Sequence, residues 1–458
     1  MIRVRENLNP QSDDELKTEI LAKCKENKVR TVILRFVDIL GMPKAITIPV
    51  EILEDALDNG IGFDGSSIEG FVRIFESDLV AKPDPATFKI VPWSEPEKKE
   101  ALIVCDIYRP GGKPFEGDPR YILKRALKEL DSMGYIFNVG PEIEFFLLKA
   151  NEKPEVTHTP HDVGGYFDFT PLDKASSFRN DVTFVLQEMG MNIEASHHEV
   201  APGQHEIDFE FADALTTADN VITYKNAVKS IALKYGIFAT FMPKPFFQIN
   251  GSGMHTHQSL FEIKSGNNAF FDPNDKYNLS ELAYHFIGGQ LKNIRAMSAI
   301  LSPTVNSYKR LVPGYEAPTY ICWGRRNRSA LIRVPEYFVG KEKAMRVELR
   351  CPDPSCNPYL AFAVMLKAGL DGIKNRIEPP DPIEEDVYEF DDVKLSKLYI
   401  HTLPASLGEA LEEMKKSNII KETLGEYTFK KYIEAKSKEW NEYRIQITRW
   451  ELEKYLYL

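Results

Sequence analysis

Four segments of this chain carry charged or polar side chains at every second residue, with mostly apolar residues between them. In PEIEFFLL, Glu142 and Glu144 alternate with Ile143, Phe145 and Leu147. Side chains two residues apart share one face of a β-strand. The pattern therefore predicts a strand with one carboxylate face and one apolar face, and it limits the fold to one that buries the apolar side of a sheet.

Three further segments, GQHEIDFEF, MHTHQS and RVELR, repeat this pattern. Their shared faces carry Glu206, Asp208 and Glu210; His255, His257 and Ser259; and Arg346, Glu348 and Arg350. Each face taken alone fits the solvated side of an antiparallel sheet. The faces together favour a second interpretation, because neighbouring carboxylates repel one another unless a cation lies between them. With Glu199 in HHEVAPGQHE, they would supply mostly oxygen ligands for two magnesium or manganese ions.

Glycine-rich and arginine-rich segments bear on the binding of anions. NGSGMH lacks the GKS or GKT ending of a Walker A loop and the last glycine of GxGxxG, so ATP, if it binds, is held in another way. Arginines recur in KRLVPGYEAP, GRRNRSALIR and RVELR, enough to grip carboxylate and phosphate oxygens bidentately. Such arginines alone more often lie on a surface.

Bulk properties exclude several classes of protein. A chain of 458 residues with 43% hydrophobic and 27% charged residues is typical of a globular protein with more than one domain. Its net charge of -11 argues against nucleic acid as the main partner. The polar N-terminus and the lack of any run of about eighteen apolar residues predict a cytoplasmic protein that does not enter a membrane. Five scattered cysteines predict buried thiols, not a disulfide framework or a zinc site.

Periodicity and turn signals predict two domains, 1–108 and 109–458. In the first, a helix over 13–28 precedes strands, among them 29–39, 45–49 and 101–108. In the second, strands such as 137–149 and 203–211 alternate with helices such as 118–134 and 216–236, and the last eighty residues are mainly helical. The predicted class is α+β, with an extensive antiparallel sheet in the larger domain.

The motifs FDGSSIEGF, PEIEFFL, HHEVAPGQHEID, NGSGMHTHQSL, KRLVPGYEAP, RNRSALIRVP and RVELRCPDPSCNPYLAF resemble, in order, the signatures of bacterial and archaeal type I glutamine synthetase. The resemblance runs nearly end to end. It implies a β-grasp-like N-terminal domain before a large catalytic domain. It also implies a glutamate–ammonia ligase of nitrogen assimilation, which joins ammonium to L-glutamate through γ-glutamyl phosphate and gives L-glutamine, ADP and phosphate.

The same resemblance implies a role for individual residues. The first metal ion would be bound by Glu144, Glu199 and Glu206, and the second by Glu142, His255 and Glu348. ATP would contact Glu194, His257, Ser259, Arg328, Arg333, Lys343 and Arg346, with Arg328 also stabilising the transferred phosphoryl group. Glutamate would be held by Asn250, Gly251, Arg310, Glu316 and Arg350. Ammonium would lie near Asp64, Ser67, Tyr166 and Glu316.

Two of these residues would act on the reacting atoms directly. Asp64, on a loop from an adjacent subunit, would take a proton from ammonium, and Glu316 would close over the intermediate and exclude water. The family assembles as dodecamers of two hexameric rings, so a homo-oligomer is expected, and a nitrogen-regulatory protein is a further candidate partner.

Regulation can be compared with the two branches of the family. The surroundings of Tyr388 lack the Asn-Leu-Tyr setting of an adenylylation loop, which favours the Bacillus-type branch. Arg73 matches the arginine linked there to glutamine feedback, although Phe75 replaces an acidic neighbour. The segment 334–345 is longer than in those relatives, which affects the assignment of Lys343 to ATP.

Two related hypotheses stay open beside glutamine synthesis. One is a γ-glutamyl ligase that uses another amine, and the other is a non-catalytic scaffold of the same fold. A scaffold would have lost metal ligands, whereas all the matching positions are filled here, and relatives specific for other amines tend to alter the pocket in which Asp64 is present.

Overall fold

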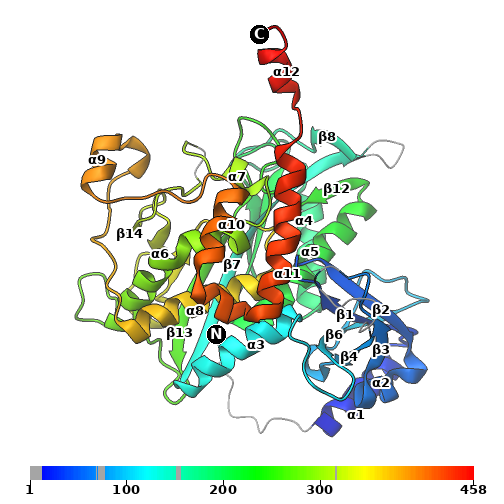
Figure 1. The fold of residues 1–458 in the computed structure, drawn as a ribbon. Coiled ribbons are helices and arrows are strands. Elements are labelled where there is room, and N and C mark those ends of the chain that lie inside the picture. Colours follow the sequence, from blue (N-terminus) through cyan, green and yellow to red (C-terminus); the bar gives the residue numbers. More distant parts are fainter. Residues whose placement is uncertain (1–12, 69, 71–77, 151–155, 315–316) are drawn as a thin grey trace.

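The computed structural model describes residues 13–68, 70, 78–150, 156–314 and 317–458 (Figure 1). Among them, two separate sheets organise the chain. In Figure 1 the N-terminal sheet, in blue, lies to one side of a larger body of strands and helices. The α+β class predicted from the sequence is confirmed.

The N-terminal part contains one mixed sheet of six described strands, in the order β2-β1-β6-β4-β3 with β5 paired to β6. Strands β1 and β6 are parallel, while β1 and β2 are antiparallel. Its elements are α1 (Asp13–Glu26), β1 (Thr31–Val37), β2 (Pro43–Pro49), η1 (Val50–Ile52), α2 (Leu53–Asn59), β3 (Ile61–Asp64), β4 (Asp78–Pro83), η3 (Pro85–Thr87), β5 (Lys89–Ile90) and β6 (Glu100–Tyr108).

The larger part contains a sheet of ten described strands, in the order β14-β15-β16-β13-β7-β10-β9, with β8, β11 and β12 also paired to β7. Every pairing in it is antiparallel except that of β14 with β15. The strands are β7 (Tyr135–Ala150), β8 (Val156–Pro160), β9 (Ile193–His198), β10 (Gln204–Phe209), β11 (Ala212–Asp213), β12 (Ile237–Thr240), β13 (Met254–Glu262), β14 (Trp323–Arg325), β15 (Ile332–Val334) and β16 (Val347–Leu349).

Helices pack against the apolar side of this sheet, because the inward side chains of β7, Ile143, Phe145 and Leu147, belong to the same hydrophobic core as the helices. The helices are α3 (Pro119–Ser132), α4 (Ser176–Glu188), α5 (Ala214–Lys234), α6 (Glu281–Leu301), α7 (Ser307–Arg310), α8 (Pro358–Asn375), α9 (Asp392–Lys397), α10 (Leu407–Lys416), α11 (Asn418–Arg444) and α12 (Arg449–Tyr455), with short turns η4 (Glu342–Ala344) and η5 (Val387–Glu389). None of these helices is both long and apolar enough to span a bilayer.

The two parts are joined by buried ion pairs centred on Arg120 of α3. Its guanidinium lies 2.6 Å from Asp106 and 2.8 Å from Asp84, both in the N-terminal part, and 3.0 Å from Asp219 of α5. Strand β6 ends at Tyr108, where the sequence predicts the domain boundary. The position of that domain boundary stays a prediction, because nothing in the structure tests it directly.

Two smaller expectations can be compared with the structure. All five cysteines are free and buried, as predicted. The helical C-terminal region is present, but its last predicted run, 427–456, is split between α11 and α12. The break follows Arg444, and α12 begins with a capping box in which Thr448 and Glu451 bond to each other's backbone N–H groups. In Figure 1, α12 points away from the rest of the chain.

Candidate active site

Strand register brings the charged faces side by side. Strand β10 pairs with β7 so that Glu206 lies opposite Glu144, and β13 pairs with the other edge of β7 so that His255 lies opposite Glu142. Residues opposite each other on antiparallel strands point to the same side of the sheet. The faces predicted separately from β7, β10 and β13 therefore form one continuous polar surface.

This surface continues onto the next two strands. Glu348 of β16 lies opposite His257 of β13, and Arg333 of β15 lies opposite Glu348. The carboxylates along it are not solvated, since Glu144, Glu206 and Glu348 are only 8%, 6% and 1% exposed. The interpretation of these faces as the wet side of a sheet is therefore wrong for these residues.

One acidic cluster on this surface contains Glu142, His257 and Glu348, whose ligand atoms all lie within 4.8 Å of one another. His257 Nε2 lies 2.8 Å from Glu142 Oε1. His255 Nδ1, the predicted ligand, lies 3.5 Å from Glu142 Oε2 and 3.8 Å from Glu348 Oε1. Burial opposes ionisation of Glu142, but the two histidines outweigh it and lower the pKa of that carboxyl.

Arginines hold Glu348 in its charged form. Arg350 Nε lies 3.1 Å from its Oε1, and Arg333 Nε contacts its Oε2. Burial alone would raise the pKa of Glu348, but His257, Arg350 and Arg333 together lower it. This carboxylate is therefore ionised and oriented before any metal ion arrives.

A second acidic cluster contains His197, Glu199 and Glu206, also with ligand atoms within 4.8 Å of one another. His197 Nδ1 lies 3.4 Å from Glu199 Oε1, and its Nε2 lies 3.3 Å from Glu206 Oε1. Burial raises the pKa of Glu206 well above its ordinary value, and the nearby carboxylates of Asp208, Glu144, Glu142 and Glu199 raise it further. A cation placed among these oxygens would relieve the repulsion, so the donor set fits a divalent ion.

His197 was missed by the sequence prediction, which took only carboxylates for this cluster. The sequence did contain a signal for His197. Counting residues back from the turn between β9 and β10 places His197 opposite Glu206. Asp208, noted on the same face, also lies in this region. Burial and the carboxylate of Glu142 raise the pKa of Asp208 to about 7.

Glu144 connects the metal-ligand surface to the glycine-rich loop. Its Oε2 accepts hydrogen bonds from the Gly253 N–H at 2.9 Å and from Gln204 Nε2 at 2.8 Å. Gln204 Nε2 also donates to the Gly251 carbonyl at 3.1 Å. Burial raises the pKa of Glu144 to about 7, although the Gly253 N–H opposes the shift. No pattern in the sequence marks Gln204, because its role comes from a contact between distant segments.

The glycine-rich loop brings backbone close to side chains of the site. A Cβ on Gly251 would lie 2.2 Å from the Pro243 carbonyl, and one on Gly253 would lie 2.7 Å from Arg310 Nη2. Only glycine fits such distances. Arg310, predicted to bind glutamate, donates to the backbone carbonyls of Cys351 at 2.8 Å and Arg350 at 3.1 Å. Asn250 begins this loop and is half-buried.

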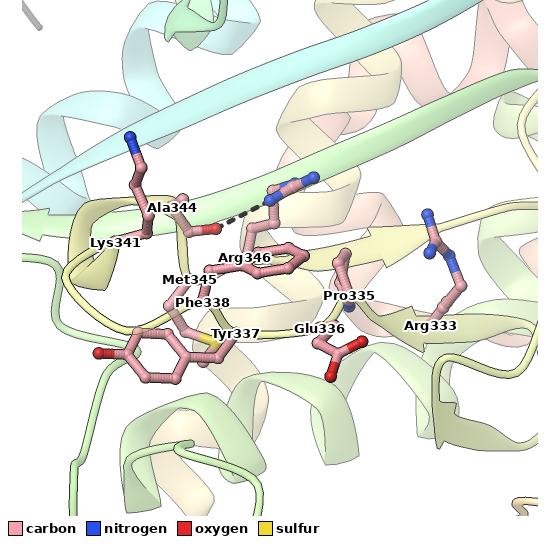
Figure 2. A pocket seen from close by; sticks show the side chains of 9 residues that line it. All are labelled: Arg333, Pro335, Glu336, Tyr337, Phe338, Lys341, Ala344, Met345 and Arg346. Atoms are coloured by element: carbon pink, nitrogen blue, oxygen red, sulfur yellow. Dashed lines mark hydrogen bonds between the residues drawn. The ribbon is translucent and has the colours of Figure 1, made fainter.

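A pocket of about 460 Å³ opens next to the cluster of Glu142, His257 and Glu348, between β15 and β16 (Figure 2). Its lining consists of Arg333, Pro335, Glu336, Tyr337, Phe338, Lys341, Ala344, Met345 and Arg346. Arg346 Nε lies 3.1 Å from His257 Nδ1, which ties the pocket to the metal-ligand surface. Figure 2 shows Arg333, Arg346 and Lys341 along the lining. Lys343 is exposed on η4 and is not one of the lining residues.

Comparison with known proteins identifies the chain. The sequence model of the family described as "Glutamine synthetase, catalytic domain" matches residues 116–455, and that described as "Glutamine synthetase, beta-Grasp domain" matches residues 28–110. The chain belongs to the glutamine synthetase family. The resemblance to type I glutamine synthetase and the β-grasp N-terminal domain predicted from the sequence are thereby confirmed.

Individual glutamine synthetases match over nearly their full length. The protein of Methanosarcina mazei is 53% identical over 440 residues, covering 96% of this chain and 97% of its own. The protein of Thermotoga maritima is 52% identical, covering 94% of this chain and 98% of its own. A solved structure titled "Apo GmaS without ligand" superposes with a TM-score of 0.86 at 32% identity, covering 96% of this chain and 100% of its own.

The remaining predicted residues of this glutamine synthetase family member lie around the same surface or apart from it. Ser259 is buried on β13, and Glu194 is exposed on β9. Burial raises the pKa of Tyr166, and Arg328, in the turn between β14 and β15, opposes that rise. Asp64 ends β3 on the N-terminal sheet, exposed, and accepts from the Ser66 N–H at 2.8 Å.

Three further predicted residues lie either outside the described part of the chain or on the loop that follows β3. Arg73 and Glu316 lie outside the described residues. Ser67 is described and exposed, on the same N-terminal loop as Asp64. The structure thus assembles the predicted metal ligands within one chain, and it leaves two of the predicted ammonium residues in the N-terminal part, Asp64 at the end of β3 and Ser67 in the turn after it.

Proposed function

We propose that this site ligates ammonium to L-glutamate with ATP, through γ-glutamyl phosphate, and releases L-glutamine, ADP and phosphate. The observation that carries the proposal is the surface on which the buried Glu144, Glu206 and Glu348 converge with the partly buried Glu142 in a chain of the glutamine synthetase family. Buried carboxylates at such density have little use in a scaffold, because their repulsion destabilises the fold. A non-catalytic role is therefore disfavoured.

Two magnesium or manganese ions fit the donor set. Glu144, Glu199, Glu206 and His197 would hold the first, and Glu142, His255 and Glu348 would hold the second, with His257 adjacent. Bound there, such ions supply positive charge that stabilises a transferring phosphoryl group. The chain's own contribution is to fix the carboxylates before binding, as Arg333 and Arg350 do for Glu348.

ATP is proposed to occupy the pocket beside β15 and β16. Arg333 and Arg346 line it and lie close to Glu348 and His257, where they can bind phosphate oxygens. Lys341 replaces Lys343 as the lysine facing the pocket. A related solved structure titled "GmaS/ADP complex-Conformation 1" supports a nucleotide in this fold, with a TM-score of 0.85 at 32% identity.

Glutamate and ammonium are proposed to meet on the other side of the metal ligands. The loop of Asn250 and Gly251, with Arg350, would hold glutamate so that its side-chain carboxylate receives the phosphoryl group. Asp64 of a neighbouring subunit would take a proton from ammonium, and the ammonia nitrogen would then bond to the acyl carbon as phosphate leaves. Arg328 beside Tyr166 would stabilise charge on the phosphoryl group.

A homo-oligomer is part of this proposal, and a dodecamer of two hexameric rings is the expected form. The arm that follows α11 supports it, since Ile445, Ile447, Trp450 and Leu456 are exposed there. Apolar side chains at that density on a projecting arm are typical of a segment that packs against another subunit. Glutamine feedback through Arg73, a nitrogen-regulatory partner and a cytoplasmic location complete the proposal.

Phosphate release tests the proposed reaction. The purified protein with ATP, glutamate and either manganese or magnesium should release phosphate only when ammonium is added. Equal turnover with putrescine or ethanolamine would favour the alternative ligase that uses another amine. Release without any amine would contradict both.

A further inference from the structure

A cluster of buried polar side chains lies directly behind the acidic cluster of Glu199 and Glu206. It consists of Asp162, Asp173, Arg179, His198 and His205. The side chains of Asp162 and His198 are both 0% exposed. His198 and His205 immediately precede the two proposed metal ligands, Glu199 and Glu206, in the sequence.

Asp162 is the centre of this cluster. Its Oδ1 accepts from the Gly203 N–H and lies 2.9 Å from His198 Nε2, and its Oδ2 accepts from the Lys174 N–H at 3.1 Å. The other ring nitrogen of His198, Nδ1, lies 2.7 Å from the Glu199 carbonyl oxygen. One carboxylate therefore holds both ends of the turn 198–203 and also closes the loop 162–174.

The two segments that Asp162 joins both carry proposed site residues. The turn carries Glu199, and the loop carries Tyr166. Their backbones are tied again by the Phe167 N–H, which donates to the His198 carbonyl at 3.0 Å. Gly164 crosses the His198 ring so closely that a Cβ there would lie 2.8 Å from Nε2. These contacts together fix the position of the turn 198–203 relative to the loop 162–174.

The cluster is not arranged as a metal site, although Asp162, His198 and His205 have the right residue types. Arg179 Nη1 lies 2.9 Å from His205 Nδ1, and because a guanidinium only donates, this nitrogen is the acceptor. The proton of the neutral ring is then on Nε2, which leaves no lone pair for a metal ion. Arg179 also pairs with Asp173 at 2.6 Å, so the cluster already contains its own cation.

We propose that Asp162 is a positioning residue, which presents Glu199 to the first metal ion through Gly203 and His198 and sets Tyr166 against the same turn. The inference rests on the proposed function, because it takes Glu199 as a metal ligand. Residues that orient metal ligands commonly change metal affinity by about 10- to 100-fold when they are removed.

The test is direct manganese binding, measured by electron paramagnetic resonance on the full-length protein without nucleotide or glutamate. Asp162→Ala should weaken one of the two manganese sites by about 10- to 100-fold and leave the other within about twofold. Asp162→Asn keeps an acceptor for Gly203 and His198 and should recover most of that loss. A merely structural role would not separate the two sites.

A matched control is Asp118→Ala at the start of α3. Asp118 is 1% exposed and accepts from the backbone N–H groups of Ile107 in β6 and Arg120 in α3, so it is a similarly buried carboxylate that joins two segments of backbone. Its removal should lower Tm while leaving both manganese sites within about twofold of wild type.

Three outcomes decide the proposal. Unchanged manganese binding in Asp162→Ala, with a drop in Tm like that of the control, would overturn it. Loss of a further bound manganese ion beyond the two proposed sites would make the cluster itself a metal site and would also overturn it.

If Asp162→Ala does not fold, His198→Gln, which cannot reach both Asp162 and Glu199, should weaken the first site at least threefold. Failure of ammonium-dependent phosphate release in the wild type would instead remove the proposed function while leaving this binding result intact.

Discussion

The polar side of the ten-stranded sheet and the exposed end of β3 carry the two kinds of chemistry proposed for this protein, and they are built in opposite ways. Glu144, Glu206 and Glu348 are buried and surrounded by fixed partners, whereas Asp64 is exposed on a short strand. The first region has a donor set for cations that one chain can surround alone. In the proposed oligomer the second region meets its substrate at another subunit, so the first region is complete in a single chain and the second would be completed by assembly.

The largest effect is expected from Glu348→Ala. It removes a buried ligand and leaves Arg333 and Arg350 without their carboxylate, so phosphate release should fall by roughly 10³-fold and stability by about 3–5 kcal/mol. The measurements are the release assay and thermal unfolding. Glu262→Ala, an exposed carboxylate at the end of the same sheet's β13, is the control and should change neither. Normal turnover in Glu348→Ala would remove the second metal site from the proposal.

Asp64→Ala comes next and should affect catalysis alone. Ammonium-dependent synthesis should fall by about 10²-fold, because a proton acceptor is lost. Tm and manganese binding should stay at the wild-type values, because the side chain is exposed and lies on the other sheet. A large drop in Tm would break the distinction between the two regions.

Mixing the two variants sharpens the comparison further. When Asp64→Ala and Glu348→Ala subunits are unfolded, mixed and reassembled, sites made from the intact part of each should restore roughly a quarter of wild-type activity. Recovery requires that Asp64 serves a neighbouring subunit. No recovery, with assembly confirmed by sedimentation, would mean that Asp64 acts on its own chain.

Much of this arrangement follows from local sequence, because alternation along one strand fixes which side chains share a face. The predicted faces of β7, β10, β13 and β16 are all present. Register between strands is not local, and it decides that Glu206 meets Glu144. Gln204 and Asp162 were missed for this reason, since each acts through a partner on a distant segment, whereas His197 could have been found from the register of its own hairpin.

A change of pH is expected to have a smaller effect on stability, and this effect concerns the buried carboxylates of the ten-stranded sheet but not Asp64. In metal-free protein, burial raises the pKa of Glu144 to about 7, above its value in the unfolded chain. A carboxyl shifted in this direction stabilises the fold at low pH and loses that contribution as pH rises towards 7. Tm of the metal-free protein should therefore fall between pH 5 and 7.5 by a few degrees. Glu144→Gln or added manganese should flatten the slope, and a rising Tm would contradict it.

The smallest effect is expected at the nucleotide pocket. Lys341 lines it and Lys343 does not, so Lys341→Ala should raise the KM for ATP by about threefold, as expected for one exposed ion pair. Lys343→Ala is the matched control and should leave KM unchanged. The reverse result would restore the assignment made from sequence.

The ion pairs of Arg120 also bear on how the chain is made. The strands of the N-terminal sheet are complete at Tyr108, but Asp219 follows Arg120 by 99 residues and Tyr359, which bonds to Asp219, follows it by a further 140. At typical rates of about 5–20 residues per second, the N-terminal sheet forms roughly 5 to 20 s before Asp219 exists to anchor it. A newly made chain therefore carries a folded but unanchored N-terminal unit for about a quarter of its time on the ribosome.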